Sequence, residues 1–355
     1  RFGDVNVANK LCATSRCSKA IIPIPASRRR SCANLPQKRI LANMSTDPRW
    51  PKGYALPTAE DWLLSVLSRS PLPLAEARAA LASADEASLS SAVLRKALLL
   101  RPAVRDVLLD RDHYQPETLA RIASVFAQLR AASYSAVPSP DFVARMVDRH
   151  PSFSEHARAA LLSQLADVDG SNSVVLNKLI ESALFCPDLS EDDLLVLVSR
   201  SAEHPEDEVM CLIAFHPHAT PTVWSRLLDL SQYLAPNGQA RLAAAIASRP
   251  AARRDPTLRE RLESGPHEAR LELAVDADRP QFVRIFTELA QLRPDLAVAL
   301  LMRVDPPRSE WIPLDALVHL LENADSNIRQ TTIAALGRLR ITPPLSRPSR
   351  SSTNP

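Results

Sequence analysis

A proline-containing turn recurs along the chain at intervals of 36, 30 and 33 residues. The turns begin at His150-Pro151, Cys186-Pro187, His216-Pro217 and Arg249-Pro250, and each is followed by polar residues and then by Leu or Val at helical spacing. Proline fixes φ and lacks an amide donor, so it starts or ends a helix. An interval of this length fits a pair of short helices, which bury a hydrophobic face only by stacking on the next pair. The sequence therefore predicts a stack of helical hairpins.

Helical periodicity covers the region from Leu56 to about Leu339. Apolar residues recur there at spacings of three and four, without the alternation expected of a strand. Several helix starts carry a side-chain oxygen that accepts from the free amides of the first turn, namely Thr58 with Asp61, Ser139-Pro140, Ser190 with Asp193, Thr220-Pro221 and Asp255-Pro256. The predicted helices cover residues 58–69, 73–83, 87–100, 102–110, 116–132, 140–149, 153–166, 172–185, 191–201, 206–215, 221–233, 237–248, 256–263, 266–275, 280–291, 295–303, 313–322 and 326–339.

The composition agrees with an all-α fold that packs helices closely. Hydrophobic residues make up 46% of the chain, but aromatic residues only 5% and glycine only six positions. Burial must therefore come mainly from Ala, Leu, Val and Ile, which suit helix-on-helix packing. We predict an all-α solenoid, that is, an extended stack of short helical hairpins.

Charge is distributed unevenly between the N-terminal segment and the rest of the chain. Residues 1–43 carry nine Lys or Arg and one acidic residue, whereas residues 44–339 carry 31 basic and 39 acidic residues. An acidic body does not favour a broad phosphate-binding surface. We therefore expect no extensive contact with nucleic acid.

Four segments follow from these patterns. Residues 1–43 are either a transit segment or an upstream region translated in error ahead of Met44, and the arginine-rich composition, typical of a GC-rich bacterial genome, favours the second. Residues 44–132 form an N-terminal helical subdomain, residues 140–339 the repeat array and residues 340–355 a disordered tail. No apolar run reaches the length of a membrane span, so we expect a cytoplasmic protein.

The turn phrase resembles that of leucine-rich-variant repeats, and Asp325-Ser326-Asn327-Ile328-Arg329 with Ala334-Ala335-Leu336-Gly337 resembles the second helix of a HEAT repeat. The resemblance covers about residues 140–339. It implies that Asp325 caps a helix, that Arg329 packs or pairs between neighbouring repeats, and that the Ala-Leu pair fills the seam between them. Such arrays serve many functions, so the resemblance bears on fold more than on activity.

One cluster has the residue types of a metal site. Cys211, His216 and His218 lie within eight residues, but zinc needs a tetrahedral set, and Cys211 belongs to an apolar helix while the histidines lie in the turn that follows. We interpret the histidines as turn or cap residues, and we predict no metal. Cys211 and Cys186 are expected to be buried free thiols.

The N-terminal cysteines raise a second cofactor question. A relative of the variant-repeat family carries an iron–sulfur cluster ahead of its repeats, and Cys12, Cys17 and Cys32 lie in the corresponding place here. Three thiolates leave a four-thiolate cluster one ligand short. We predict no cofactor.

Arginines near Arg253-Arg254 suggest a different activity. HEAT-like arrays include DNA glycosylases that hold the duplex with arginines and stack an aromatic residue near the lesion, and Trp224 lies one helix upstream of these arginines. Trp224, Arg253 and Arg254 are therefore the interaction candidates. The alternative interpretation is a solvated polar face, with Trp224 packing in the core.

The sequence as a whole favours a binding function over catalysis. It contains no glycine-rich phosphate loop and no nucleophile elbow, and its acid pairs fall in first helical turns or surface loops, so we predict no catalytic residue. The expected function is a non-catalytic scaffold that binds another protein. The alternatives are a HEAT-like DNA glycosylase or other nucleic-acid-binding enzyme, and a HEAT-like bilin lyase.

Overall fold

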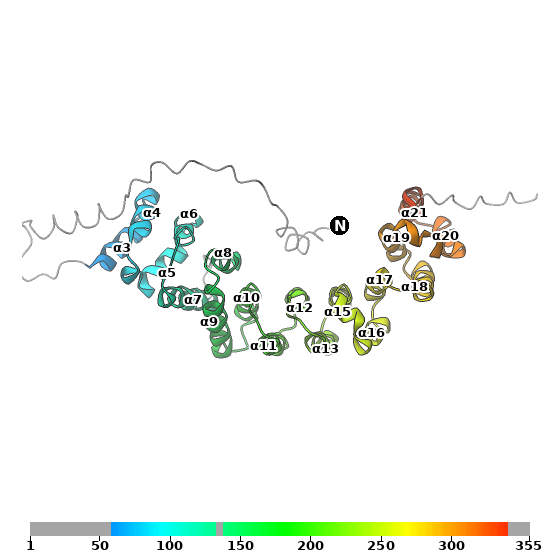
Figure 1. The fold of residues 1–355 in the computed structure, drawn as a ribbon, viewed down its shortest axis with the longest axis horizontal. Coiled ribbons are helices and arrows are strands. Elements are labelled where there is room, and N and C mark those ends of the chain that lie inside the picture. The colour runs from blue at the N-terminus through cyan, green and yellow to red at the C-terminus, as the bar shows by residue number, and fades with distance from the viewer. Residues whose placement is uncertain (1–57, 133–137, 340–355) are drawn as a thin grey trace, which may run out of the picture. The chain divides into compact units, whose positions relative to one another are not determined.

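The chain is described by a computed structural model that covers residues 58–132 and 138–339. The described residues are helical, without strands, so the prediction of an all-α fold is confirmed. Figure 1 shows the helices following one another in chain order from blue to red. They are α3 (Ala59–Leu67), α4 (Leu74–Ser83), α5 (Ser91–Leu99), α6 (Pro102–Arg105), α7 (Pro116–Ala131), α8 (Asp141–Arg149), α9 (Phe153–Asp167), α10 (Ser173–Ala183), α11 (Glu191–Ser201), α12 (Asp207–Phe215), α13 (Pro221–Leu230), α14 (Pro236–Ala247), α15 (Pro250–Arg254), α16 (Pro256–Glu263), α17 (His267–Val275), α18 (Arg279–Leu292), α19 (Pro294–Arg303), α20 (Leu314–Leu321) and α21 (Ser326–Leu339).

Four short 3₁₀ helices join these elements within the described ranges. They are η1 (Glu86–Ser88), η2 (Asp106–Leu108), η3 (Ser231–Tyr233) and η4 (Pro306–Trp311). Two of them end helices that the sequence predicted to be longer, because residues 102–110 divide into α6 and η2 and residues 221–233 into α13 and η3. The five-residue α15, which starts at Pro250, was missed because its proline was taken as part of a turn.

Helices two apart in the chain pack against each other. The contacts run from α3 to α5, α7 and α9, and then from α10 to α12 and α14; they pass over the short α15 and α16 to α17, and continue to α19 and α21. The intervening helices α11 and α13 also pack on each other, as do α18 and α20. Most helices also contact a neighbour in the chain, for example α9 with α10 and α18 with α19.

The buried side chains form two hydrophobic cores. The first extends from Leu63 to Leu273 and the second from Leu271 to Leu339. Helix α17 contributes to both, since Ala269 and Leu273 pack in the first and Leu271 and Ala274 in the second. The first core runs without a break from α7 into α9 and α10, across the division between 44–132 and 140–339 that the sequence indicated.

Helix starts were predicted well where a hydroxyl or carboxylate precedes the first turn. Thr58 and Ser190 form capping boxes with Asp61 and Asp193, and Thr220 and Asp255 accept from the amides of Val223 and Leu258. The prediction for Ser139 was wrong: Pro140 is the N-cap residue of α8, and no side chain caps this helix. The predicted leader at 1–43, the start at Met44 and the tail at 340–355 lie outside the described residues. None of the described helices combines the length and the apolar character that crossing a membrane requires.

Candidate functional site

Polar side chains of one hairpin bind backbone carbonyls of the hairpin before it, and we call each such contact a joint. The carbonyl lies between 27 and 37 residues earlier in the chain. These separations resemble the intervals of the recurring turn, which are 36, 30 and 33 residues. The donors are Arg111 to Leu81 and Ala84, Arg121 to Leu89, Arg200 to Val168, His204 to Gly170, His216 to Cys186, His218 to Leu189, Arg261 to Ser225, Arg308 to Val275, and Arg338 to Leu301 and Val304.

His216 and His218, which were weighed as metal ligands and interpreted as turn residues, both belong to joints. Nε2 of His216 lies 3.3 Å from the carbonyl oxygen of Cys186, and its Nδ1 accepts from the amide of His218. This assigns the proton of the neutral ring to Nε2. The imidazole is 4% exposed, and burial lowers its pKa, which keeps the ring neutral. Nδ1 of His218 lies 2.9 Å from the carbonyl oxygen of Leu189.

These bonds support the interpretation of the histidines as turn residues. Cys211 is half-buried on α12, and burial raises the pKa of its thiol to about 12. Cys186 is buried as predicted, with a thiol pKa also raised by burial to about 12. Within residues 58–132 and 138–339, no three His, Cys, Asp or Glu side chains are grouped so that they could hold a metal ion.

A similar joint holds the turn ahead of α10. Arg200 donates to the carbonyl of Val168 at 2.5 Å, and Nε2 of His204 lies 2.5 Å from the carbonyl oxygen of Gly170. Arg200 also pairs with Glu203, whose carboxylate lies against the Cα of Gly170. A Cβ at position 170 would be 1.7 Å from Oε2 of Glu203. Glycine at this position therefore allows the close approach of the next hairpin.

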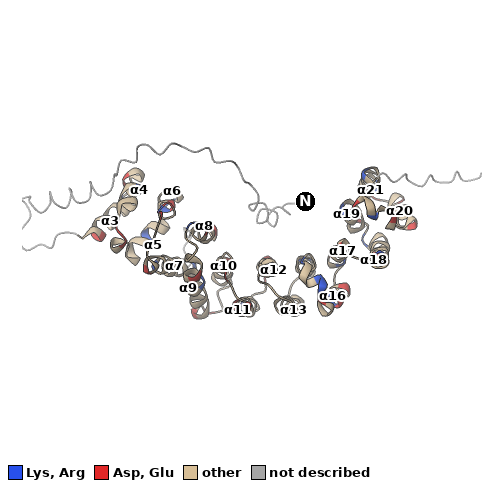
Figure 2. Cartoon of the chain, viewed as in Figure 1, with Lys and Arg blue, Asp and Glu red and all other residues tan. Residues whose placement is uncertain are grey.

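The arginines considered for DNA binding are largely engaged within the chain. Arg253 lies 2.6 Å from the carboxylate of Asp276 and donates to the carbonyl of Glu272, and its side chain is only 15% exposed. Arg261 pairs with Asp229 at 2.8 Å. Arg254, in contrast, is exposed at the end of α15. Figure 2 shows Lys and Arg, in blue, gathered beside the label of α16.

Trp224 lies in the first core. Its side chain is 1% exposed, and its indole N–H donates to the carbonyl of Ala214 at 3.0 Å. Because the ring is covered by its own chain, it has no surface to offer to a partner. Burial therefore favours the packing interpretation over the interaction interpretation for this residue.

The segment at 325–337 is the one on which the resemblance to a HEAT repeat rests. A carboxylate oxygen of Asp325 accepts from the amide of Asn327, and Ala335 and Leu336 are buried in the second core. Arg329 does not pair with a neighbouring repeat. It donates to the carbonyls of Asn323 and Ala324, which precede it in the same hairpin.

Near the C-terminal end, ion pairs between helices, which we call carboxylate joints, are found in addition to the carbonyl joints of Arg308 and Arg338. Arg303 makes two bonds to the carboxylate of Glu272, at 2.6 and 2.9 Å. Arg293 joins Glu268 at 2.9 Å, and Arg270 binds Glu288. These acidic partners were not predicted, because each lies on a different helix from its arginine and the sequence does not show which pairs meet.

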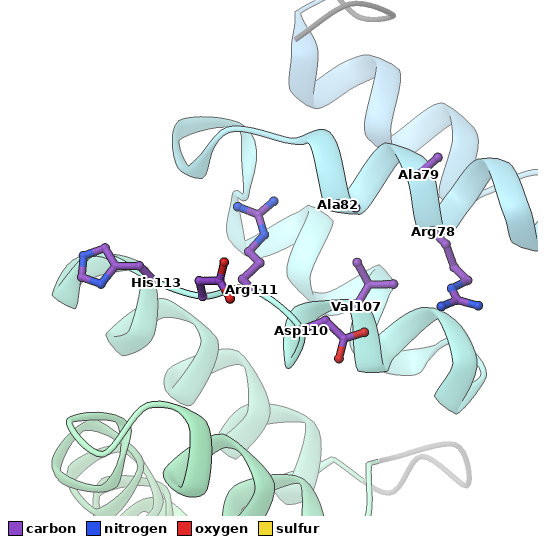
Figure 3. A pocket seen from close by; sticks show the side chains of 8 residues that line it. Arg78, Ala79, Ala82, Val107, Asp110, Arg111 and His113 are labelled. Atoms are coloured by element: carbon purple, nitrogen blue, oxygen red, sulfur yellow. The ribbon is translucent and has the colours of Figure 1, made fainter. Parts of the chain in front are cut away.

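A pocket of about 580 Å³ opens between α4 and the loop that follows η2 (Figure 3). Ala79, Ala82 and Val107 supply its apolar lining, while Arg78 and His113 lie at opposite ends of it. The guanidinium of Arg111 is held by the carbonyls of Leu81 and Ala84 and lies 5.6 Å from the ring centroid of Tyr114. Acidic residues at 110 and 112 alternate with these basic groups. The lining therefore favours neither an anion nor a cation. The sequence did not predict this pocket, because its two sides lie about 30 residues apart in the chain.

Large apolar side chains remain exposed on several described helices. The most exposed in the middle of the chain are Tyr233 at 67% and Val174 at 60%. Apolar groups in water are unfavourable by about 25 cal/mol per Å² relative to burial. The full set is Leu74, Val174, Val196, Phe215, Tyr233, Leu292, Met302, Leu314 and Ile333.

Comparisons with known proteins identify no family for this chain. No protein-family model matches the sequence, and no curated protein matches it. Among solved structures, an engineered protein studied by a structural genomics consortium aligns with 79% of this chain and 88% of its own, at 15% identity and a TM-score of 0.32.

Proposed function

We propose that the described helices form an α-solenoid of HEAT-like or leucine-rich-variant-like hairpins that acts as a non-catalytic scaffold for another protein. The packing of helices two apart in the chain supports the solenoid. So does the recurrence of joints at separations of 27 to 37 residues along the described part of the chain. Stacked repeats of this kind present an extended surface on which a partner can lie.

The observation that carries the binding function is that polar and apolar side chains have different places in the structure. Basic and imidazole groups are used to join successive hairpins, whereas large apolar side chains such as Val196 and Phe215 remain exposed. Interfaces between proteins depend on apolar and aromatic anchors rather than on charge. A protein partner therefore fits this surface better than a phosphate backbone does.

The competing function is nucleic-acid binding, including base excision by a HEAT-like glycosylase. Such an enzyme needs arginines free to contact phosphates. Arg253 and Arg261 are paired with Asp276 and Asp229, and Arg338 binds two carbonyls of its own chain. Arg254 is the candidate that remains exposed. These pairings weigh against the nucleic-acid function.

The test is capture of partners from the lysate of the native organism by the full chain, with and without nuclease, followed by mass spectrometry. The scaffold function predicts a stoichiometric protein that is retained after nuclease treatment. A parallel titration with duplex DNA over a range of salt concentrations measures phosphate contacts directly, because each one steepens the salt dependence.

Two results would contradict the proposal. The first is that captured material disappears on nuclease treatment. The second is tight DNA binding that Arg254→Ala weakens. A control substitution of Arg78, which lies on α4 and is distant from Arg254 in the sequence, should leave both measurements unchanged.

A further inference from the structure

Helix α14 begins with an asparagine that is followed by a glycine. Asn237-Gly238 is the one place in the whole sequence where glycine follows asparagine. An asparagine deamidates when the backbone nitrogen of the next residue attacks its side-chain carbonyl carbon, and a side chain on that next residue hinders the attack. Glycine has no side chain and gives the backbone the widest choice of conformations. The sequence therefore places at this position the pair of residues best suited to the reaction.

The surroundings of Asn237 leave both reacting groups without hydrogen-bond partners in the described part of the chain. The side chain of Asn237 is exposed and binds no other described residue. The amide of Gly238 lies in the first turn of the helix, where backbone N–H groups have no partner within the helix. The first helical bond of α14 runs instead from the amide of Gln239 to the carbonyl of Ala235. The nitrogen that must attack is therefore not held by a hydrogen bond of the helix.

Folding controls how often the two groups meet. A helical backbone holds the attacking nitrogen away from the side-chain carbon, so the first turn of α14 must open before the reaction can occur. Gly238 is buried, and a Cβ at this position would lie 3.0 Å from the Cβ of Asp207 on α12, which opposes the opening. The turn has no capping side chain and contains a glycine, and both features favour the opening. Helix ends open locally at a lower cost than the whole chain, so global unfolding is not required.

We propose that Asn237 is a site of spontaneous deamidation in the folded protein. The nitrogen of Gly238 forms a bond to the side-chain carbonyl carbon of Asn237 and loses its proton, the side-chain amide leaves as ammonia, and a succinimide ring results. Water then adds to one of the two ring carbonyls and breaks its bond to the nitrogen, which gives aspartate or isoaspartate. The net reaction exchanges water for ammonia and turns a neutral side chain into a carboxylate. This modification does not depend on the scaffold function.

The new carboxylate lies where it disturbs the contact between α12 and α14. Arg241 now lies 2.8 Å from a carboxylate oxygen of Asp207 and 3.9 Å from one of Glu208, and both acids belong to α12. Position 237 is four residues before Arg241 on the same face of α14, so an aspartate there competes for the guanidinium. An isoaspartate lengthens the main chain beside Gly238, which packs on Asp207. Both products therefore loosen the packing of α14 on α12.

The test follows deamidation of the full chain during incubation at mildly alkaline pH, both in native buffer and in urea. Trypsin releases residues 227–241 as one peptide, in which Asn237 is the single asparagine. Mass spectrometry measures the conversion of its amide to a carboxyl group, and fragment spectra assign the change to position 237. Asn172 and Asn323 are internal controls, because each precedes a residue with a side chain and each uses its side-chain oxygen to accept from a backbone amide.

In native buffer we expect the product to accumulate at Asn237 before it accumulates at Asn172 or Asn323. Urea should accelerate the reaction at Asn237, because it removes the helix that holds the two groups apart. Asn237→Gln should abolish this product, since the longer side chain forms the corresponding ring far more slowly. Asn237→Asp carries the aspartate from the start and should reduce the protection of α12 from hydrogen exchange at low salt, whereas Asn237→Gln, which stays neutral, should not. Circular dichroism shows whether both variants retain their helices.

Two outcomes would overturn the proposal. If Asn237 reacts in urea but in native buffer is converted no faster than Asn172 and Asn323, the folded chain protects this site and deamidation is not a property of the native protein. If Asn237→Asp and Asn237→Gln protect α12 equally, the new carboxylate does not compete for Arg241, and the loosening of α14 on α12 is wrong for the aspartate product.

Discussion

The middle and the C-terminal end of the chain join successive hairpins with partly different chemical groups. From α10 to α13, imidazoles join successive hairpins by binding carbonyls beside the joint of Arg200, as His216 does with Cys186. From α17 to α21, ion pairs such as that between Arg303 and Glu272 are found beside the carbonyl joints of Arg308 and Arg338. The first set belongs to the first hydrophobic core and the second set largely to the second. The spacing of the joints is therefore similar in the two regions, while the groups that form them differ in part.

The largest expected effect is a loss of protection from hydrogen exchange that stays within one of the two cores. Phe126 stacks on Phe142 in the first core, with ring centroids 5.6 Å apart, and Phe286 stacks on Phe282 in the second at 5.8 Å. Replacing a buried Phe by Ala costs about 3–5 kcal/mol. We expect Phe286→Ala to reduce protection of α18–α21 from hydrogen exchange and Phe126→Ala to reduce that of α7–α9, because each repeat contacts only its neighbours. Equal loss of protection throughout the chain in either variant would contradict the division into two cores.

Local elements were predictable because their signals are local. A cap such as Ser190 and the periodicity of α11 lie within a few residues of each other, so residues 191–201 were predicted with the bounds that the structure shows. Ser139 failed because Pro140 takes the N-cap position instead.

The joints and the pocket carried no comparable signal. A carbonyl acceptor such as that of Cys186 belongs to every residue type, so the sequence does not reveal which one His216 binds. The burial of Trp224 depends likewise on helices that the chain brings together only when it folds. Recurring spacing thus indicated that repeats stack, but not which side chains would be used in stacking.

The second-largest effect should be a response of stability to pH at the joint of His216. The pKa of His216 is lowered from 6.5, mainly by burial, so the folded state favours the neutral ring. Its contribution to stability is therefore complete above pH 6.5 and is lost as the pH falls from there through the lower folded value. Burial also lowers the pKa of His150, which acts in the same direction.

Replacing His216 should separate this response from the rest of the chain. We expect His216→Phe to lower the free energy of unfolding at neutral pH by about 1–3 kcal/mol, because it leaves the carbonyl of Cys186 without its donor. It should also reduce the loss of stability between neutral and acidic pH, measured by urea unfolding. The control is His319→Asn, at an exposed position on α20. An unchanged pH dependence in His216→Phe would show that the neutral joint is not the acid-sensitive element.

Helix caps allow a finer comparison between the two regions. Ser190 caps α11 with a neutral hydroxyl, whereas Asp278 caps α18 with a carboxylate that accepts from Gln281 at 3.0 Å. Each substitution by Ala should cost about 0.5–2 kcal/mol in urea unfolding. Added salt should reduce the cost only for Asp278→Ala, because the carboxylate also interacts with the helix dipole. Ser139→Ala should have almost no effect on the free energy of unfolding. If it costs as much as Ser190→Ala, Ser139 caps α8, contrary to the structure.

The smallest expected effect is the coupling between Arg303 and Glu272. The two bonds suit a guanidinium and a carboxylate, yet the Arg303 side chain is 43% exposed. Exposed ion pairs typically contribute about 0.2–1 kcal/mol, and salt screens them. A double-mutant cycle with Arg303→Met and Glu272→Gln, measured at two salt concentrations, should give a coupling within that range that decreases as salt is added. The bond from His216 to Cys186 should respond little to the same change in salt, because it joins neutral groups. If instead the ion pair proves insensitive to salt, the two kinds of joint differ in composition but not in physical behaviour, and only the response to pH distinguishes the middle of the chain from its C-terminal end.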